Sequence, residues 1–211
     1  MTALPKDSCR EGAHLKGRPP DWLLFFAKFL RHGTAIAAVA PSSPWLAQAV
    51  VRGINFAETT CIVELGAGTG SITEELVRHA DQRCRLLIVE RDADFCRRLR
   101  ERFPGADIVE ADALDLERLL DERAIQSVDH FVCGLPLPSF DRVSRDRILD
   151  LVRRRLASNG TFRQLTNMPF VYYPLYRRYF NNVGFRFIVR NLPPGGFYVC
   201  EDARAPADTA A

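Results

Sequence analysis

Long apolar runs are absent from this chain of 211 residues. No stretch reaches the roughly 18 consecutive apolar residues that a membrane-spanning helix needs. The chain also lacks the basic start, apolar segment and small-residue cleavage site of a secretory signal. We therefore expect an intracellular, cytoplasmic protein that does not cross a membrane.

Cysteine and histidine are few and irregularly spaced. The six cysteines form no CxxC pair and keep no zinc-ligand spacing to a histidine, which argues against a metal site and against a disulfide framework. The four histidines show no motif spacing, so none is predicted to be a catalytic base. The hydrophobic content of 47% and charged content of 26% exclude a largely disordered chain.

Lysine is nearly missing, with 3 residues against 26 arginines, and charge is distributed unevenly. Residues 58–129 hold 17 acidic and 10 basic residues, a net of −7, whereas residues 142–190 hold 11 arginines and 2 aspartates, a net of +9. This asymmetry indicates that the basic half and the N-terminus face a polyanion, either nucleic acid or an anionic bilayer. An arginine surface that contacts only solvent is the alternative.

The pattern along the chain predicts one main domain with an appendage. Residues 1–20 are typical of a flexible leader, residues 21–56 of a helical extension, residues 57–201 of the main domain and residues 202–211 of a loose tail. The extension begins with an amphipathic helix after Asp21, and a second helix is expected near Ser43–Pro44. The apolar face of the first helix is formed by Trp22, Phe25, Phe26, Phe29 and Leu30. Such a face is suited to the membrane interface, or to packing as a lid on the domain's own sheet.

The main domain alternates between strand and helix patterns. Strands are expected at 60–65, 85–90, 106–111, 128–133 and 161–166, with helices at 72–79, 92–103, 116–123 and 142–156 between them. A helix at 173–183 and two strands at 185–190 and 197–201 follow. This order predicts an α/β fold with a mostly parallel seven-stranded sheet, covered on both faces and ending in one antiparallel edge strand.

The first strand runs into a glycine-rich turn with the sequence ELGAGTG, residues 64–70. Glycines let the backbone turn tightly and approach a ligand, and ligands bind at the carboxyl ends of parallel strands. A dinucleotide fingerprint would need glycine at position 71, where Ser71 stands. The GxGxG spacing after an acidic residue resembles motif I of the class I S-adenosylmethionine (SAM) methyltransferases, which have a Rossmann-like fold.

This resemblance implies that the chain binds SAM and releases S-adenosylhomocysteine (SAH). The loop would curve round the methionine part of the cofactor; its residues are Gly66, Ala67, Gly68, Thr69 and Gly70. Glu90, beside Arg91, would accept the ribose hydroxyls, and Asp112, beside Ala113, would bind the adenine amino group. Glu64 would approach the cofactor's amino group, although an acid at a strand end also caps helices.

The fourth strand ends in Cys133-Gly134-Leu135-Pro136-Leu137. Adenine amino methyltransferases carry an Asn/Asp-Pro-Pro-Tyr-like signature here, so its absence counts against a ribosomal adenine dimethyltransferase. Residues 20–200 instead resemble the bacterial phospholipid N-methyltransferases. The resemblance rests on the aromatic helix, on residues 39–43, on the glycine loop, on residues 134–137 and on Arg190-Asn-Leu-Pro-Pro194. The chain departs from the family at Cys133 and at Gly195-Gly196.

The family resemblance implies a peripheral enzyme on the inner face of the membrane that methylates the amino headgroup of phosphatidylethanolamine or its mono- and dimethyl derivatives. Some relatives act on ornithine lipids instead. An RNA adenine N6-dimethyltransferase and a SAM-binding protein without transferase activity remain as alternatives.

Three types of contact with the substrate are expected. Backbone oxygens of Gly134 and Leu135 would orient the substrate nitrogen. Tyr172 and Tyr173 would shield a methylated cation by cation–π contact, or serve only in aromatic packing. Arg186 and Arg190 would bind the lipid phosphate, or lie on a solvated strand.

Overall fold

The computed structural model describes residues 43–168, 170–191 and 194–205. The expected leader at 1–20 and the aromatic helix with Trp22, Phe25, Phe26 and Phe29 lie outside the described residues, as does most of the C-terminal tail.

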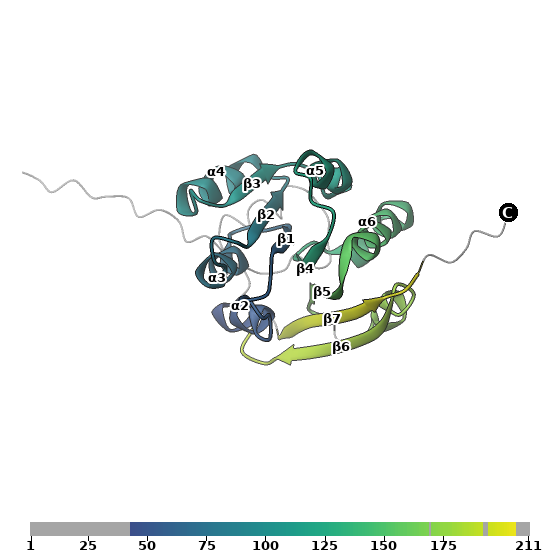
Figure 1. Cartoon of the computed structure of the whole chain (residues 1–211). Coiled ribbons are helices and arrows are strands. Elements are labelled where there is room, and N and C mark those ends of the chain that lie inside the picture. Colours follow the sequence, from purple (N-terminus) through teal and green to yellow (C-terminus); the bar gives the residue numbers. More distant parts are fainter. Residues whose placement is uncertain (1–42, 169, 192–193, 206–211) are drawn as a thin grey trace, which may run out of the picture.

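The core of the domain is a seven-stranded sheet with the order β3-β2-β1-β4-β5-β7-β6 (Figure 1). β1, β2, β3, β4 and β5 pair in parallel, whereas β7 runs antiparallel to both β5 and β6. The mostly parallel sheet with an antiparallel pair at its edge is thereby confirmed. The strands are β1 Cys61–Leu65, β2 Arg85–Glu90, β3 Asp107–Glu110, β4 Val128–Cys133, β5 Leu156–Thr166, β6 Phe180–Ile188 and β7 Gly195–Ala203.

Helices cover both faces of this sheet (Figure 1). Buried side chains of α2, α3 and α4 pack on one face, and those of α5, α6 and α7 pack on the other. β1 lies between β2 and β4, so the chain order reverses there and a crevice is expected outside the carboxyl ends of β1 and β4. The helices are α2 Pro44–Val51, α3 Ser71–His79, α4 Ala93–Arg102, α5 Leu116–Glu122, α6 Arg142–Arg155 and α7 Tyr173–Tyr176, with short 3-10 turns η1 Ala113–Asp115 and η2 Leu137–Ser139.

α2 is anchored at both ends. The Ser43 hydroxyl accepts a hydrogen bond from the Leu46 N–H at 3.2 Å, and Pro44 occupies the first turn, as the sequence predicts. At the other end the buried Arg163 of β5 donates to the carbonyls of Val50 and Arg52. A guanidinium at a helix C-terminus satisfies carbonyls that have no partner within the helix.

The expected helix at 173–183 is wrong in its second half. α7 ends at Tyr176, and β6 begins at Phe180, which pairs with Ala203 of β7. The Phe180 ring also stacks on Phe162 of β5 at 5.7 Å between centroids. Strand pairing and burial of this ring on the sheet override the local helical pattern.

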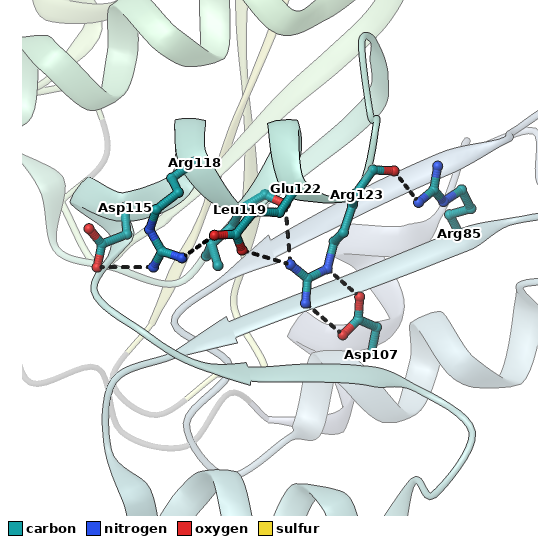
Figure 2. Close-up of polar contacts among 7 residues, drawn as sticks. All are labelled: Arg85, Asp107, Asp115, Arg118, Leu119, Glu122 and Arg123. Atoms are coloured by element: carbon teal, nitrogen blue, oxygen red, sulfur yellow. Dashed lines mark hydrogen bonds and ion pairs between the residues drawn. The ribbon is translucent and has the colours of Figure 1, made fainter.

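The far end of α5 is tied to the amino ends of two strands (Figure 2). Arg123 makes a bidentate ion pair with Asp107 at the start of β3, with Nε–Oδ2 and Nη2–Oδ1 distances of 2.6 and 3.2 Å. Arg85 of β2 donates to the Arg123 carbonyl at 2.6 Å. These contacts hold the start of β3 to the end of α5. Asp112 lies in the turn between β3 and η1.

The part of the chain that the structure describes shows neither a membrane-spanning helix nor a metal site. Within it, no helix is both long and apolar enough to span a membrane. Nor do three or more His, Cys, Asp or Glu side chains of this part of the chain come together in a way that could hold a metal ion.

Candidate active site

The turn after β1 depends on three glycines. Gly66, Gly68 and Gly70 have φ angles of +75°, +54° and +83°, in the left-handed region that strains other residues. A Cβ on Gly66 would lie 2.5 Å from Leu135 Cδ2, and a Cβ on Gly134 would lie 2.6 Å from the Gly66 oxygen. The loops after β1 and β4 are therefore in direct contact, and only glycine allows this approach.

Glu90, at the end of β2, faces this turn. Its carboxylate accepts hydrogen bonds from the backbone N–H groups of Gly68 and Asp92, both at 2.9 Å. The carboxylate is thereby held against the glycine loop and retains lone pairs that can accept hydroxyl protons. The contact of Glu90 with a ribose stays a prediction.

Asp112 lies at the end of β3, at the same edge of the sheet. Its Oδ1 accepts from the Leu114 N–H at 2.9 Å, and its Oδ2 lies 3.7 Å from Arg91 Nη1. Asp112 lines a cavity of about 50 Å³ whose other walls are Gly66, Val89, Arg91, Ala111, Ala113, Leu135 and Phe140. The structure thus brings together residues from four of the predicted segments: Gly66, Arg91, Asp112 with Ala113, and Leu135. Phe140 and Val89 were not predicted, because neither belongs to a recognisable motif.

This cavity holds only part of a ligand, because pockets for whole small molecules typically measure about 300–1,000 Å³. A larger cavity of about 620 Å³ lies at the amino ends of the strands, beside Cys84, Pro104 and Ile125. It contains none of the glycine-loop residues. Glu90 and Asp112, the predicted contacts of the cofactor, lie instead at the carboxyl ends of the strands, where the smaller cavity is.

Glu64 lies in β1, just before the glycine loop, and is only 1% exposed. Thr73 of α3 donates to its Oε2 at 2.7 Å. Burial raises the pKa of Glu64 to about 8, with a further contribution from the charge of Glu90, while the hydrogen bond from Thr73 acts in the opposite direction. Through its hydrogen bond with Thr73, the Glu64 side chain joins β1 to α3. Its contact with the cofactor's amino group stays a prediction.

The loop after β4 is held by the buried Gln164 of β5. Gln164 Nε2 lies 2.7 Å from the Leu135 oxygen, 3.2 Å from the Cys133 oxygen and 3.0 Å from the Leu165 oxygen. The Leu135 carbonyl also accepts from the Leu137 N–H at 2.8 Å. Sequence reasoning missed Gln164, since a single glutamine in a strand carries no signal.

These bonds distinguish the two predicted backbone acceptors. The Leu135 carbonyl accepts from the Gln164 amide, the Leu137 N–H and, at 4.0 Å, the Cys133 thiol, whereas no described residue donates to the Gly134 carbonyl. The Gly134 carbonyl can therefore accept a further hydrogen bond, and its contact with a substrate nitrogen stays a prediction.

Cys133 lies inside the core, below the loop after β4. Its side chain is fully buried, and burial raises the pKa of the thiol to about 12. A neutral buried thiol is neither a nucleophile nor a headgroup contact.

Tyr172 and Tyr173 follow β5 and pack beside the large core cluster. The Tyr172 N–H donates to the Tyr198 hydroxyl at 3.1 Å, and the Arg177 guanidinium lies 5.4 Å from the centre of the Tyr173 ring. Neither tyrosine lines the cavity beside Asp112. Their part in shielding a cation stays a prediction.

The two motifs on which the resemblance partly rests, around residues 43 and 190, meet at the start of α2. The Ser43 N–H donates to Asn191 Oδ1 at 3.0 Å, and the Arg190 guanidinium lies 4.7 Å from the centre of the Trp45 ring. Arg186 and Arg190 are both exposed, and their contact with a phosphate stays a prediction.

The unusual Gly195-Gly196 pair has a structural explanation. A Cβ on Gly196 would collide with the Arg186 carbonyl, and a Cβ on Gly195 would collide with the Asn167 side chain. Close approach of the Arg186 backbone requires glycine at position 196, whereas a side chain at position 195 would require the Asn167 side chain to move and the Thr166 carbonyl to shift slightly.

Comparisons with known proteins agree with this geometry. The family model described as "Methyltransferase domain" matches residues 62–160. An ornithine lipid N-methyltransferase from Singulisphaera acidiphila is 47% identical over 187 residues, which is 87% of this chain and 97% of that protein. A ribosomal RNA small subunit methyltransferase A from Marinobacter nauticus is 36% identical over 100 residues, covering 45% of this chain and 35% of that protein.

Among solved structures, human methyltransferase-like protein 13 in complex with SAH has a TM-score of 0.55 and 17% identity, covering 79% of this chain and 82% of that chain. This similarity shows the fold. The glycine loop and the acids at the ends of β2 and β3 fit the nucleoside cofactor SAM. The chain is a SAM-dependent methyltransferase, and it belongs to the same family as the Singulisphaera enzyme, within the class I methyltransferases.

Proposed function

We propose that the chain transfers a methyl group from SAM to the amino group of a membrane lipid headgroup. The observation that carries this proposal is the 47% identity to the ornithine lipid N-methyltransferase across 97% of that protein. An ornithine lipid is therefore the first substrate to test. Phosphatidylethanolamine, which the sequence motifs favour, presents the same primary amine and is the second.

The reaction needs a neutral amine whose lone pair points at the methyl group on the cofactor's sulfur. Glu90 and Asp112 would hold the ribose and the adenine. The Gly134 carbonyl would accept an N–H of the substrate amine and turn its lone pair toward the methyl group. The bond from Gln164 keeps this loop in place on the side of β5.

A membrane location follows from the same proposal. Residues 151–200 contain eight arginines and no aspartate or glutamate, which favours the anionic inner surface of a membrane as the place of action. RNA is a weaker candidate, because the matched ribosomal RNA methyltransferase shares only 35% of its length with this chain. The loop at residues 133–137 also lacks the adenine-methyltransferase signature.

The test is incubation with methyl-labelled SAM and vesicles that contain either an ornithine lipid or phosphatidylethanolamine, followed by lipid chromatography. We expect label in at least one amino lipid and none in phosphatidylcholine, whose nitrogen is fully methylated. Label found only in added ribosomal RNA would overturn the proposal. Bound SAM without labelled lipid would indicate a binding protein.

A further inference from the structure

An exposed apolar surface lies beyond the ends of β5 and β6. We name it the 168–189 patch; its members are Met168, Phe170, Val171, Phe187 and Val189. Phe170 and Val189 are each 71% exposed, and Phe187 is 51% exposed. A cluster of large, solvent-exposed apolar side chains commonly marks an interaction site.

The members of the patch belong to one continuous surface. The Phe170 ring contacts Phe185 of β6, with 5.5 Å between centroids. Phe187 lies two residues further along β6, on the same face as Phe185. Met168 is joined to this group through Tyr172, whose hydroxyl lies 3.5 Å from the Met168 sulfur.

The patch adjoins the candidate active site. Thr166 pairs with Gly196 and Ile188 pairs with Gly195, so β5 and β6 end at the same edge of the sheet. β4 is parallel to β5 and ends there too. Gln164, which holds the Leu135 carbonyl, is only four residues before Met168.

Two arginines neighbour these apolar groups in the chain. Arg186 stands between Phe185 and Phe187 on β6, with its side chain on the opposite face of this edge strand, and Arg190 follows Val189. Both are exposed, and neither makes an ion pair with a carboxylate among the described residues. Apolar side chains mixed with arginines match the interface of an anionic bilayer, where hydrocarbon and phosphate lie within a few ångströms of each other. The phosphates of a nucleic acid could pair with the arginines. A nucleic acid has no hydrocarbon region, however, in which the valine and methionine side chains could be buried.

We propose that the 168–189 patch docks the enzyme on an anionic lipid bilayer, with its apolar side chains in the interface and Arg186 and Arg190 on lipid phosphates. This inference rests on the proposed function, and it concerns a part of the chain other than the aromatic segment at residues 22–30. Docking through this edge would deliver a lipid headgroup to the Gly134 loop without removing the lipid from the membrane.

The test uses the full chain and vesicles of phosphatidylcholine with phosphatidylglycerol. We expect the double variant F170S/F187S to bind these vesicles at least tenfold more weakly than wild type in a sedimentation assay. The matched control is V143S, which replaces a 78% exposed valine on α6 and should bind within twofold of wild type. Unchanged SAM affinity and thermal unfolding confirm that each variant is folded; should the double variant fail this check, Val189→Asp replaces it.

A second measurement separates this proposal from the proposed function. Methyl transfer to a short-chain amino lipid, kept below its micelle concentration, needs no docking. F170S/F187S should keep this activity and lose activity on vesicles. Vesicle binding by F170S/F187S within twofold of wild type overturns the docking proposal, even if lipid is methylated. Vesicle binding that depends on the patch, without methylation of either lipid form, overturns the proposed function and supports the docking.

Discussion

The side-chain amide of Gln164 donates a hydrogen bond of 2.7 Å to the backbone carbonyl of Leu135. β5 thereby sets the conformation of the loop after β4, although the two residues are 29 positions apart in the chain. The amide oxygen of Gln164 is buried and has no hydrogen-bond partner among the described residues. The side chain therefore serves the loop through its nitrogen alone.

Replacing Gln164 with leucine should lower kcat at least tenfold and change SAM affinity less than threefold. The variant loses the hydrogen bond from the Gln164 side chain to the Leu135 carbonyl, which destabilises the fold. It also removes the buried amide oxygen that has no partner, which stabilises the fold. Each effect is worth about 1–3 kcal/mol and the two oppose each other, so the free energy of unfolding should change by only about 1 kcal/mol. Steady-state kinetics and urea unfolding measure both quantities, with Q126L, at an exposed glutamine, as the control. An unchanged kcat would show that the Gln164 bond is irrelevant to catalysis.

Glu90→Ala should weaken SAM binding about a hundredfold, which corresponds to about 2.7 kcal/mol. The variant removes the acceptor for the Gly68 N–H together with the proposed acceptor for the ribose hydroxyls. Calorimetric titration with SAM measures the change, and the matched control is E110A, which removes the exposed carboxylate at the end of the neighbouring strand β3. Wild-type affinity in E90A would place the cofactor elsewhere.

The sequence allowed the sheet and the acids of the site to be predicted because both follow from local patterns. Alternating apolar runs and helical periods predicted the strands; Glu90 is the last residue of β2, and Asp112 follows β3 by two residues. Since parallel strands present their carboxyl ends at one edge, position along the chain was enough to bring these acids together.

Features that depend on distant partners could not be predicted. Gln164 acquires its role only when β5 pairs with β4, and nothing near it in the chain indicates this. The segment after Tyr176 has a helical pattern, but Phe180 pairs with Ala203, 23 residues later. In both places long-range pairing, rather than local propensity, determines the structure.

Glu64→Gln should stabilise the protein more at pH 8 than at pH 5. The folded-state pKa of Glu64 is raised to about 8 from an ordinary value of 4.5. The unfolded chain therefore releases this proton as the pH rises above 4.5, while the folded chain keeps it until about pH 8. Stability from this group is complete below pH 4.5 and is lost by about pH 8, at about 1.4 kcal/mol per pH unit at most.

Urea unfolding of wild type and E64Q at both pH values tests this expectation. Parallel pH curves would show that Glu64 is ionised in the folded state. The same variant tests the contact with the cofactor, because a contact with its amino group predicts weaker SAM binding by E64Q. Unchanged binding would limit Glu64 to joining β1 and α3.

His130 should make the protein sensitive to mild acid. Burial and the nearby charge of Arg163 lower the folded-state pKa of His130 to about 4, against a smaller opposing effect of Asp129. Its Nδ1 lies 2.9 Å from the Thr161 hydroxyl, a bond that the neutral ring can make. Below pH 6.5 the unfolded chain takes up a proton that the folded chain does not, so stability present above pH 6.5 declines toward pH 4 by up to about 3 kcal/mol. His130→Asn removes this titration, so the stability difference between wild type and variant should shrink between pH 7 and pH 4.5. A constant difference across that range would mean that His130 titrates alike in the folded and unfolded chains.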